Sequence, residues 1–461
     1  MSVPTGTTAE PGRQAAVIPL RRMLPLLARG PVNAFADIAR RSRGGIVRLN
    51  LGPLRPYLVT HPDHVRHVMR DHWQNYLRMG KVWAPVERFL GTTFAGEGPD
   101  WEASRKAYQP MFTARHVTSL TSTLADVIAE RVGLLDEPAR AGRPIEATRT
   151  MADLVVAVNT VFFFGEKSSF AEGRRLAREF GTAVKWMNVR QIMPFVPDSV
   201  PLPGDRAFAG AVEAIDALVY PLIRKARQDD GHDVLSALCR ARGTGQDADR
   251  LVRDDLVAAL VAGTDTTTHA LAWVWPLLQA HPRVAARLYE EIDHVVGTGP
   301  VRQEHLPELR YTKMVVQEVL RLYPSGWIMQ RFPVAPGDIG GVPIDAGSPV
   351  FISPYATHRL DEFWDRPLEF DPERFSPGHE HRRHRYSYFP FGGGPHQCIG
   401  RHLFSVVALL TLATIVSRHH PQVRTPGPIS PLPAALRPKQ PIELHLVPVE
   451  RRRARSARAT G

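Results

Sequence analysis

The sequence predicts a mainly α-helical fold with a small β-rich lobe. Residues 116–240 carry successive amphipathic patterns, at 119–135, 150–164, 174–189 and 207–228, each typical of a helix. Residues 251–282 form a long, nearly continuous apolar run, which indicates a buried helix. Short strands are predicted near both ends. IVRLNL and PYLVT (46–51 and 56–60) alternate on either side of a Gly-Pro turn, and 430–448 reads as a turn and a hairpin.

The chain of 461 residues contains no Ser/Gly linker and no internal repeat, and 43% of its residues are hydrophobic. We therefore expect one large domain over residues 18–448. A disordered segment without periodicity, 1–17, is expected before it, and a basic disordered tail, 449–461, after it. The two cysteines, Cys239 and Cys398, lie far apart in different contexts, which argues against a disulfide framework and fits a reducing cytosol.

The formal net charge is +12, and the Arg-rich tail contributes to it. This tail reads as a solvated end rather than as a nucleic-acid-binding segment, while a basic protein body favours docking of an acidic protein. The most apolar N-terminal stretch, 17–28, is interrupted by two arginines and two prolines. No membrane anchor is therefore expected, and a cytoplasmic location is predicted.

Trp101 and Arg105 lie four residues apart in a helix predicted to begin after Asp100 as its N-cap, so they share one face. A tryptophan that packs on an arginine stem is common and needs no function. The alternative is a pair of donors for a carboxylate, to which the forked guanidinium group is well suited.

The centre of the long apolar run is unusual for a buried helix. Gly263 and the threonines at 264, 266, 267 and 268 are poor helix formers, and Asp265 places a charge mid-run. Ala258, Ala262 and Thr266 share a face on which the two alanines leave room for a bulky neighbour. Gly263 is expected to weaken the local backbone ladder, and a hydroxyl and a carboxylate at such a break could hold water and pass protons. The alternative is an ordinary buried helix in which Asp265 is a hydrogen-bonded polar residue.

Glu318 and Arg321 form an i,i+3 pair, an arrangement that usually makes a weak surface salt bridge. Their neighbours are valines and leucines, so the pair is expected to be partly buried and to need a further partner. Arg374, in the sequence PERF at 372–375, is the predicted third member. The expected role of the three is structural.

The stretch FGGGPHQCIG, 391–400, constrains the function most. The three glycines 392–394 can adopt the positive φ values of a tight turn that aims N–H groups at the Cys398 sulfur. The apolar run 403–419 predicts a buried helix, whose N-terminus favours a negative charge on that sulfur. A lone cysteine is usually a small buried hydrophobe, but the spacing F-x-x-G-x-x-x-C-x-G from Phe391 to Gly400 points to a ligand.

This loop resembles the haem-binding loop of the cytochrome P-450 family. Four further motifs occur in the family's order: W-x-x-x-R at 101–105, A-G-x-D-T-T at 262–267, E-x-x-R at 318–321 and PERF at 372–375. The resemblance covers the chain from about residue 45 onward to residue 448. It implies the cytochrome P-450 triangular-prism fold, mainly α with a small β lobe, and a soluble, bacterial-type haem-thiolate monooxygenase. Cys398 would hold the iron of haem b.

The resemblance also implies roles for individual residues. Asp265 and Thr266 would be catalytic and deliver protons. Contacts to the haem would come from Trp101, Arg105, Arg331, His396 and Phe391, and His396 stands where many family members have Arg. The substrate pocket would be lined by Ala258, Ala262, Trp327, Ile328 and Met329, the last three with ordinary core packing as the alternative. A lid is expected at 193–205, and the tip 432–436 of the C-terminal hairpin is expected to reach the substrate.

The implied reaction inserts one oxygen atom of O2 into a lipophilic small molecule, by hydroxylation or epoxidation. A terpenoid or polyketide of bacterial secondary metabolism is the expected substrate. Electrons would come from NAD(P)H through an acidic ferredoxin or flavodoxin-type donor and its reductase, because no flavin or iron–sulfur segment is recognisable in the chain. A monomer is expected.

Two alternatives stay open. One is an O2-independent haem-thiolate isomerase or dehydratase, against which the Asp265-Thr266 pair argues. The other is a non-enzymatic haem sensor or auxiliary protein, and the presence of Cys398 argues against a degenerate auxiliary protein. His379, His381 and His384 are read as part of a solvated, Arg-rich loop rather than as a metal site.

Overall fold

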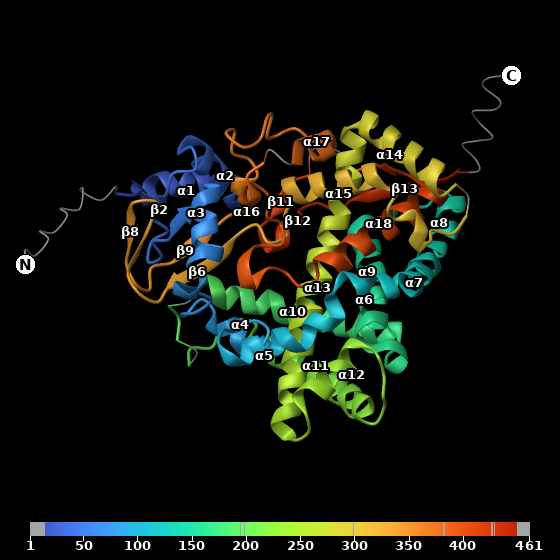
Figure 1. The fold of residues 1–461 in the computed structure, drawn as a ribbon, viewed down its shortest axis with the longest axis horizontal. Helices are drawn as coiled ribbons and strands as arrows, with labels where there is room; N and C mark the ends of the chain where they lie inside the picture. The colour runs from blue at the N-terminus through green and yellow to red at the C-terminus, as the bar shows by residue number, and fades with distance from the viewer. Residues whose placement is uncertain are drawn as a thin grey trace, which may run out of the picture. The chain divides into compact units, whose positions relative to one another are not determined.

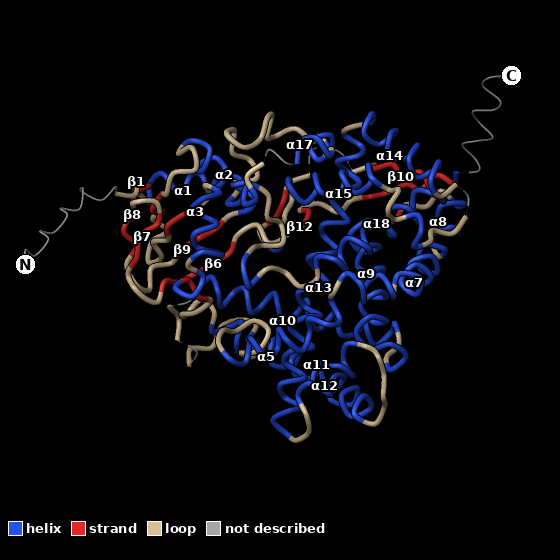
Figure 2. Tube along the Cα trace, in the orientation of Figure 1, coloured by secondary structure: helices blue, strands red, loops and turns tan. Residues whose placement is uncertain are grey.

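The longest element of the computed structural model is helix α13 (Gln246–Ala280), which contains almost all of the predicted apolar run. The structure describes residues 14–193, 195–197, 199–297, 299–380, 383–425, 427 and 429–449. They group into two compact units. A strand-rich unit lies within Met1–Gly80, Gly326–Leu368 and Arg383–Gln397, and a helical unit within Lys81–Ser325, Glu369–Arg382 and Cys398–Gly461. Figure 1 shows the elements in chain order, and Figure 2 distinguishes the helices from the strands.

The strand-rich unit is built on a six-stranded mixed sheet with the strand order β1-β2-β3-β9-β6-β4. The two strands predicted near the N-terminus are β2 and β3, which pair antiparallel with Val47 opposite Leu58. The remaining strands of this unit, β7 and β8, form a separate antiparallel pair. Its strands are β1 (Ala16–Ile18), β2 (Val47–Leu49), β3 (Tyr57–Val59), β4 (Tyr76–Leu77), β6 (Met329–Pro333), β7 (Gly337–Ile339), β8 (Val342–Ile344) and β9 (Val350–Ile352), and its helices are α1 (Leu20–Arg29), α2 (Pro31–Arg41), α3 (Pro62–Arg66) and α16 (Pro354–Thr357).

The first strand starts inside the segment for which the sequence predicts disorder. β1 begins at Ala16 and pairs in parallel with β2, Ala16 opposite Val47. Main-chain hydrogen bonds to a neighbouring strand therefore order residues that have no sequence periodicity of their own. Residues 1–13 lie outside the described part of the chain, as do residues 450–461 of the predicted basic tail.

The helical unit contains the predicted succession of amphipathic helices. α13 packs against α9, α11, α12 and α15, while α10 and α11 pack on each other. Its helices are α4 (Ala84–Leu90), α5 (Pro99–Tyr108), α6 (Ala114–Ser119), α7 (Thr121–Gly133), α8 (Asp136–Ala141), α9 (Ala147–Phe164), α10 (Phe170–Ile192), α11 (Asp205–Arg227), α12 (Val234–Arg242), α13, α14 (Pro282–Val295), α15 (Arg310–Leu322), α17 (Pro377–Glu380) and α18 (Arg401–Arg418).

The C-terminal hairpin is shorter than the sequence predicts. β11 (Pro431–Leu432) and β12 (Arg437–Pro438) form it, with Leu432 opposite Arg437. β13 (Glu443–Pro448) instead joins β10 (His419–Val423) and β5 (Ile145–Glu146) in a three-stranded antiparallel sheet. The strand predicted by the alternating pattern at 443–448 therefore forms, but it pairs with β10 and β5 rather than with the strand next to it in the hairpin.

The N-cap prediction for α5 is wrong. The helix begins at Pro99, and Gly98, with φ at +77°, is its N-cap. Proline is well suited to the first helical position because its missing N–H has no partner there. Asp100 lies inside the first turn, where its negative charge complements the helix dipole.

Within the part of the chain that the structure describes, two segments, 147–167 and 394–418, are long and apolar enough to cross a membrane by length and composition alone. In each, 67% of the apolar window is buried inside the protein. They contain α9 and α18, which are core helices of the helical unit.

Candidate active site

Cys398 lies in the helical unit immediately before α18, as the sequence predicts. Gly400 is the N-cap of this 18-residue helix, and most of the side chains of α18 are buried. The Gly400 N–H donates to the Cys398 sulfur, so backbone geometry and helix dipole both favour negative charge there.

The surroundings of the Cys398 thiol shift its pKa in opposite directions. Burial raises its pKa, while the Gly400 N–H and the positive charges of Arg105 and Arg401 lower it, and burial prevails. The side chain nevertheless retains exposed surface. A small molecule can therefore touch the sulfur, whereas the wider protein surroundings set its pKa. Metal coordination would deprotonate such a thiol, because a bound cation outweighs the cost of burial.

These features fit a thiolate ligand of a haem iron. The sulfur is accessible, it accepts a backbone N–H, and the charges acting on it are positive. Cys239, the other free cysteine, is buried in the helical unit, and burial raises its pKa to about 11. Of the two cysteines, Cys398 alone has surroundings suited to a metal ligand.

Helix α5 contributes the predicted tryptophan–arginine pair. Trp101 is buried and Arg105 is half-buried, one turn apart on α5. The Arg105 charge acts on the Cys398 sulfur, so the structure brings this face of α5 toward the cysteine. A guanidinium group in this position is suited to bind a haem carboxylate.

The predicted break at Gly263 is absent, because α13 is helical throughout this stretch. Thr264 Oγ1 donates to the Leu260 carbonyl at 2.7 Å and Thr266 Oγ1 to the Ala262 carbonyl at 2.6 Å. These bonds to the residue four positions earlier satisfy the hydroxyl groups within the helix.

Asp265 and Thr266 lie on a part of α13 that is not fully buried. The side chains of Asp265 and Ala262 are exposed, Thr266 is half-buried and Ala258 is buried. Burial by the wider surroundings still raises the pKa of Asp265, partly offset by the positive charge of Arg437. A carboxyl group with a raised pKa exchanges protons more readily near neutral pH than an ordinary aspartate does.

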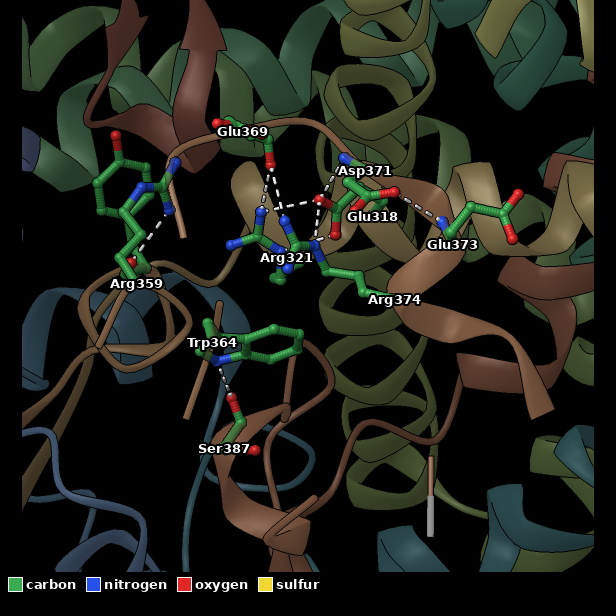
Figure 3. Close-up of polar contacts among 10 residues, drawn as sticks. Glu318, Arg321, Arg359, Trp364, Glu369, Asp371, Glu373, Arg374 and Ser387 are labelled. Atoms are coloured by element: carbon green, nitrogen blue, oxygen red, sulfur yellow. Dashed lines mark hydrogen bonds and ion pairs between the residues drawn. The ribbon is translucent and has the colours of Figure 1, made fainter. Parts of the chain in front are cut away.

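The predicted trio of Glu318, Arg321 and Arg374 is present and buried (Figure 3). The Arg321 guanidinium binds both carboxylate oxygens of Glu318, at 2.7 and 2.8 Å, and Arg374 Nε donates to Glu318 Oε1 at 3.0 Å. Both arginines also donate to the Glu369 carbonyl, and the Asp371 N–H donates to Glu318. The trio thus ties α15 to the segment 369–375.

The glycines of the cysteine loop belong to the strand-rich unit, and they differ from one another. Gly392 and Gly394 have φ values of +69° and +65°, as predicted, but Gly393 is extended. A Cβ atom on Gly393 would lie 2.5 Å from the Tyr386 ring, and one on Gly394 would lie 1.8 Å from the Met69 carbonyl oxygen. Close packing therefore requires glycine at 393, where the φ angle does not.

The segment upstream of these glycines is anchored within the same unit. Trp364 Nε1 donates to the Ser387 carbonyl at 3.2 Å, a contact that Figure 3 shows. The Phe389 N–H donates to Nε2 of the buried His358 at 3.0 Å. Phe391, the first residue of the motif, is half-buried.

His396 has a partner that the sequence did not suggest. Arg78 donates to His396 Nδ1 at 2.9 Å, and the Trp73 ring meets the His396 ring edge-on at 5.6 Å. Because arginine can only donate, His396 Nδ1 must accept and Nε2 carries the ring proton. His396 and Arg78 thus place a donor and a positive charge together.

Four further predicted residues lie in or beside β6. Arg331 is buried and donates to the Gln330 carbonyl at 2.7 Å. Trp327 is buried with its ring edge-on to Phe35 at 5.6 Å, which is core packing. Ile328 and Met329 are half-buried, so they are better placed than Trp327 to contact a substrate.

The segment 193–205, for which the resemblance implies a lid, connects α10 to α11. Arg190 is buried and donates to the carbonyl groups of Pro197 and Val200, at 3.4 and 2.9 Å. It also forms an ion pair with Asp205 at the start of α11. This arginine ties the connecting segment to both helices.

The histidine-rich loop gives no metal site among the described residues, which contain no group of three or more suitable ligands. His384 Nε2 lies 3.3 Å from Asp63. His381 is outside the described residues, as is the side chain of His379.

The family model described as Cytochrome P450 matches residues 13–446. The chain is 33% identical over 418 residues to cyclooctat-9-en-7-ol 5-monooxygenase of Streptomyces melanosporofaciens, covering 88% of each protein. It is 31% identical to cyclooctatin synthase of the same organism, covering 87% of this chain and 88% of that protein. It is 26% identical to pentalenene oxygenase of Streptomyces avermitilis, covering 89% of this chain and 91% of that protein.

The fold has solved counterparts. The crystal structure of the cytochrome P450DA heme domain superimposes with a TM-score of 0.82 at 22% sequence identity, covering 95% of this chain and 98% of that one. This similarity establishes the mainly α architecture with a small β lobe that the sequence predicts.

Proposed function

This chain belongs to the cytochrome P450 family of monooxygenases, and we propose that it inserts one oxygen atom of O2 into a terpenoid. The observation that carries the proposal is the accessible Cys398 sulfur, which accepts the Gly400 N–H and is acted on by the charges of Arg105 and Arg401. A bound haem supplies the iron at which O2 is activated. The terpenoid class is supported by the names of the Streptomyces relatives.

We propose that side chains from several elements bind the haem. Cys398 would be the iron ligand. Arg105 and Trp101 on α5 would bind haem carboxylates, as would Arg331 and His396. For Arg105 the support is its effect on the Cys398 sulfur, and for His396 it is the bond from Arg78, which fixes the ring tautomer.

Proton delivery is assigned to Asp265 and Thr266. Thr266 Oγ1 donates to the Ala262 carbonyl, so its lone pairs are available to accept a hydrogen bond from water. The raised pKa of Asp265 makes this exposed carboxyl group a proton source at the same turn of α13. Together they can pass a proton from solvent into the site by way of water.

Substrate contacts are assigned to Ala258 and Ala262 on α13 and to Ile328 and Met329 beside β6, with Trp327 as support from the core. These side chains are apolar, which suits a hydrocarbon skeleton. An acidic ferredoxin or flavodoxin with its reductase would supply electrons from NAD(P)H, because steering toward a protein of net charge +12 favours an acidic donor. We assign the enzyme to the cytoplasm and expect a monomer.

The proposal is tested with purified holoprotein, a surrogate ferredoxin and reductase, and NADPH. The probes are cyclic terpene hydrocarbons and alcohols, with a fatty acid and a macrolide lactone for comparison. We expect one oxygen atom from isotopically labelled O2 in the product of a terpene probe. Oxidation of the fatty acid or the lactone alone would refute the terpenoid assignment, and products that form without O2 would refute oxygen insertion.

A further inference from the structure

The tip of the C-terminal hairpin has an unusual backbone. Between the paired residues Leu432 and Arg437, Ala435 and Leu436 are consecutive residues with φ values of +47° and +50°. Side chains with a Cβ atom rarely adopt this left-handed conformation, and it persists only where the surroundings hold it.

Two side chains of α13 hold this tip. Trp273 Nε1 donates to the Leu436 carbonyl at 2.6 Å, and the Leu436 side chain is fully buried. The Trp273 ring is stacked on Tyr323, with a centroid distance of 3.8 Å and an interplanar angle of 7°, so the indole donor cannot swing away. One turn earlier, the ring of the buried His269 donates a hydrogen bond to the Ala435 backbone.

The same stripe of α13 carries the proposed proton source. Asp265, His269 and Trp273 are spaced four residues apart and therefore lie on one side of the helix. Arg437, at the base of the tip, exerts its positive charge on both Asp265 and His269. The hairpin thus lies along α13 from Asp265 to Trp273.

We propose that His269 and Trp273 are positioning residues that hold the tip 432–436 beside Asp265, so that replacing either of them alters how bulky molecules bind. That the tip reaches the substrate is implied by the family resemblance, and the new element is its restraint by these two side chains of α13. The effect on substrates rests on the proposed function, whereas the restraint of the tip follows from the contacts of α13 with the hairpin alone.

The structure offers a matched control for Trp273. Trp275 lies two residues further along α13 and is equally buried, but within the described residues its Nε1 has no hydrogen-bond partner. Trp273→Phe and Trp275→Phe remove the same atoms from the same helix, yet only the first removes a bond to the hairpin. His269→Gln is a second variant that alters the other contact.

The first measurement is amide hydrogen exchange of the peptides covering 430–439 in the purified full-length protein. We expect exchange there to rise about fivefold in Trp273→Phe, the factor associated with the loss of one hydrogen bond. No rise is expected in Trp275→Phe. Equal exchange in the two tryptophan variants would overturn the proposal, and so would exchange in His269→Gln unchanged from the wild-type protein. This readout does not depend on haem.

The second measurement is optical titration of the holoprotein with imidazole and with phenylimidazole, which differ in bulk. In Trp273→Phe, we expect the Kd for phenylimidazole to change about fivefold and the Kd for imidazole to stay within about twofold of the wild-type value. Parallel changes for both ligands would refute a role in selecting bulky substrates. The CO difference spectrum of the wild-type protein separates this result from a failure of the proposed function, because it reports haem ligation alone.

Discussion

Arg374 Nε donates to Glu318 Oε1 across 3.0 Å, although the two residues are 56 positions apart in the sequence. Glu318 is fully buried and Arg374 nearly so, and Arg321 occupies both carboxylate oxygens of Glu318 at the same time. The interaction therefore joins two segments through charges that water cannot reach.

Removing the shared carboxylate should destabilise the protein strongly. In Glu318→Gln two buried guanidinium groups lose their counter-charge, which costs about 3–5 kcal/mol for a buried pair. Urea unfolding curves measure the change. Arg287→Gln is the control, because the Arg287–Glu373 pair is largely exposed and its loss should cost less than about 1 kcal/mol. Similar losses of unfolding free energy in both variants would show that the buried trio stabilises the protein no more than an exposed ion pair does.

Cys398→Ala should abolish thiolate ligation. The reduced, CO-bound difference spectrum should lose the red-shifted Soret band that a thiolate-bound haem gives, because the other free cysteine is buried elsewhere in the helical unit. Cys239→Ala should keep the band. A thiolate band that survives in Cys398→Ala would disprove the assignment of the iron ligand.

Thr266→Ala should uncouple electron use from product formation. Without the hydroxyl group that accepts a hydrogen bond on α13, proton delivery slows, and we expect the product formed per NADPH to fall about tenfold with release of hydrogen peroxide. Thr267→Ala, at the next position of the helix, is the control and should stay coupled. Full coupling in the Thr266 variant would exclude it from proton delivery.

His269 should make stability depend on pH. Burial, reinforced by the charge of Arg437 and opposed by the Ala435 backbone bond, lowers the His269 pKa to about 4. The unfolded chain takes up this proton at about pH 6.5, so it binds more protons than the folded protein between pH 6.5 and pH 4. Stability is therefore complete above about pH 6.5 and falls as the pH drops toward 4, by about 3 kcal/mol.

The measurement compares urea unfolding at about pH 7 and about pH 4.5 for the wild-type protein and for His269→Gln. Other histidines with lowered pKa values, such as His419 and His116, contribute to both proteins, so the difference between the two isolates His269. The glutamine variant should lose less stability on acidification. Identical pH dependence would mean that His269 is not buried in its neutral form.

The sequence predicts best where one local pattern determines the outcome. The apolar run of α13, the strands β2 and β3, and the helix after Cys398 are each visible in a single stretch. The trio of Glu318, Arg321 and Arg374 is also predicted correctly, but only because two short motifs occur in the order typical of the family. Spacing alone does not say which arginine reaches a carboxylate from outside its own helix.

The wrong predictions concern positions whose conformation depends on adjacent residues or on distant parts of the chain. Asp100 is a good N-cap by composition, yet Pro99 after Gly98 starts the helix two residues earlier. Gly263 predicts a break, but the helix continues and nearby threonines bond within it. The locking of the hairpin by His269 and Trp273 could not be foreseen, because no local pattern links α13 to residues 435–436.

The close approach of Gly394 to Met69 has a consequence for laboratory evolution of the enzyme. Any side chain at 394 would collide with a main-chain oxygen, which no rotamer change relieves. A saturation library at this codon should return glycine alone among active clones. Libraries intended to alter the chemistry can therefore leave the codons of Gly393 and Gly394 constant and place their diversity elsewhere, for example in the hairpin or α13.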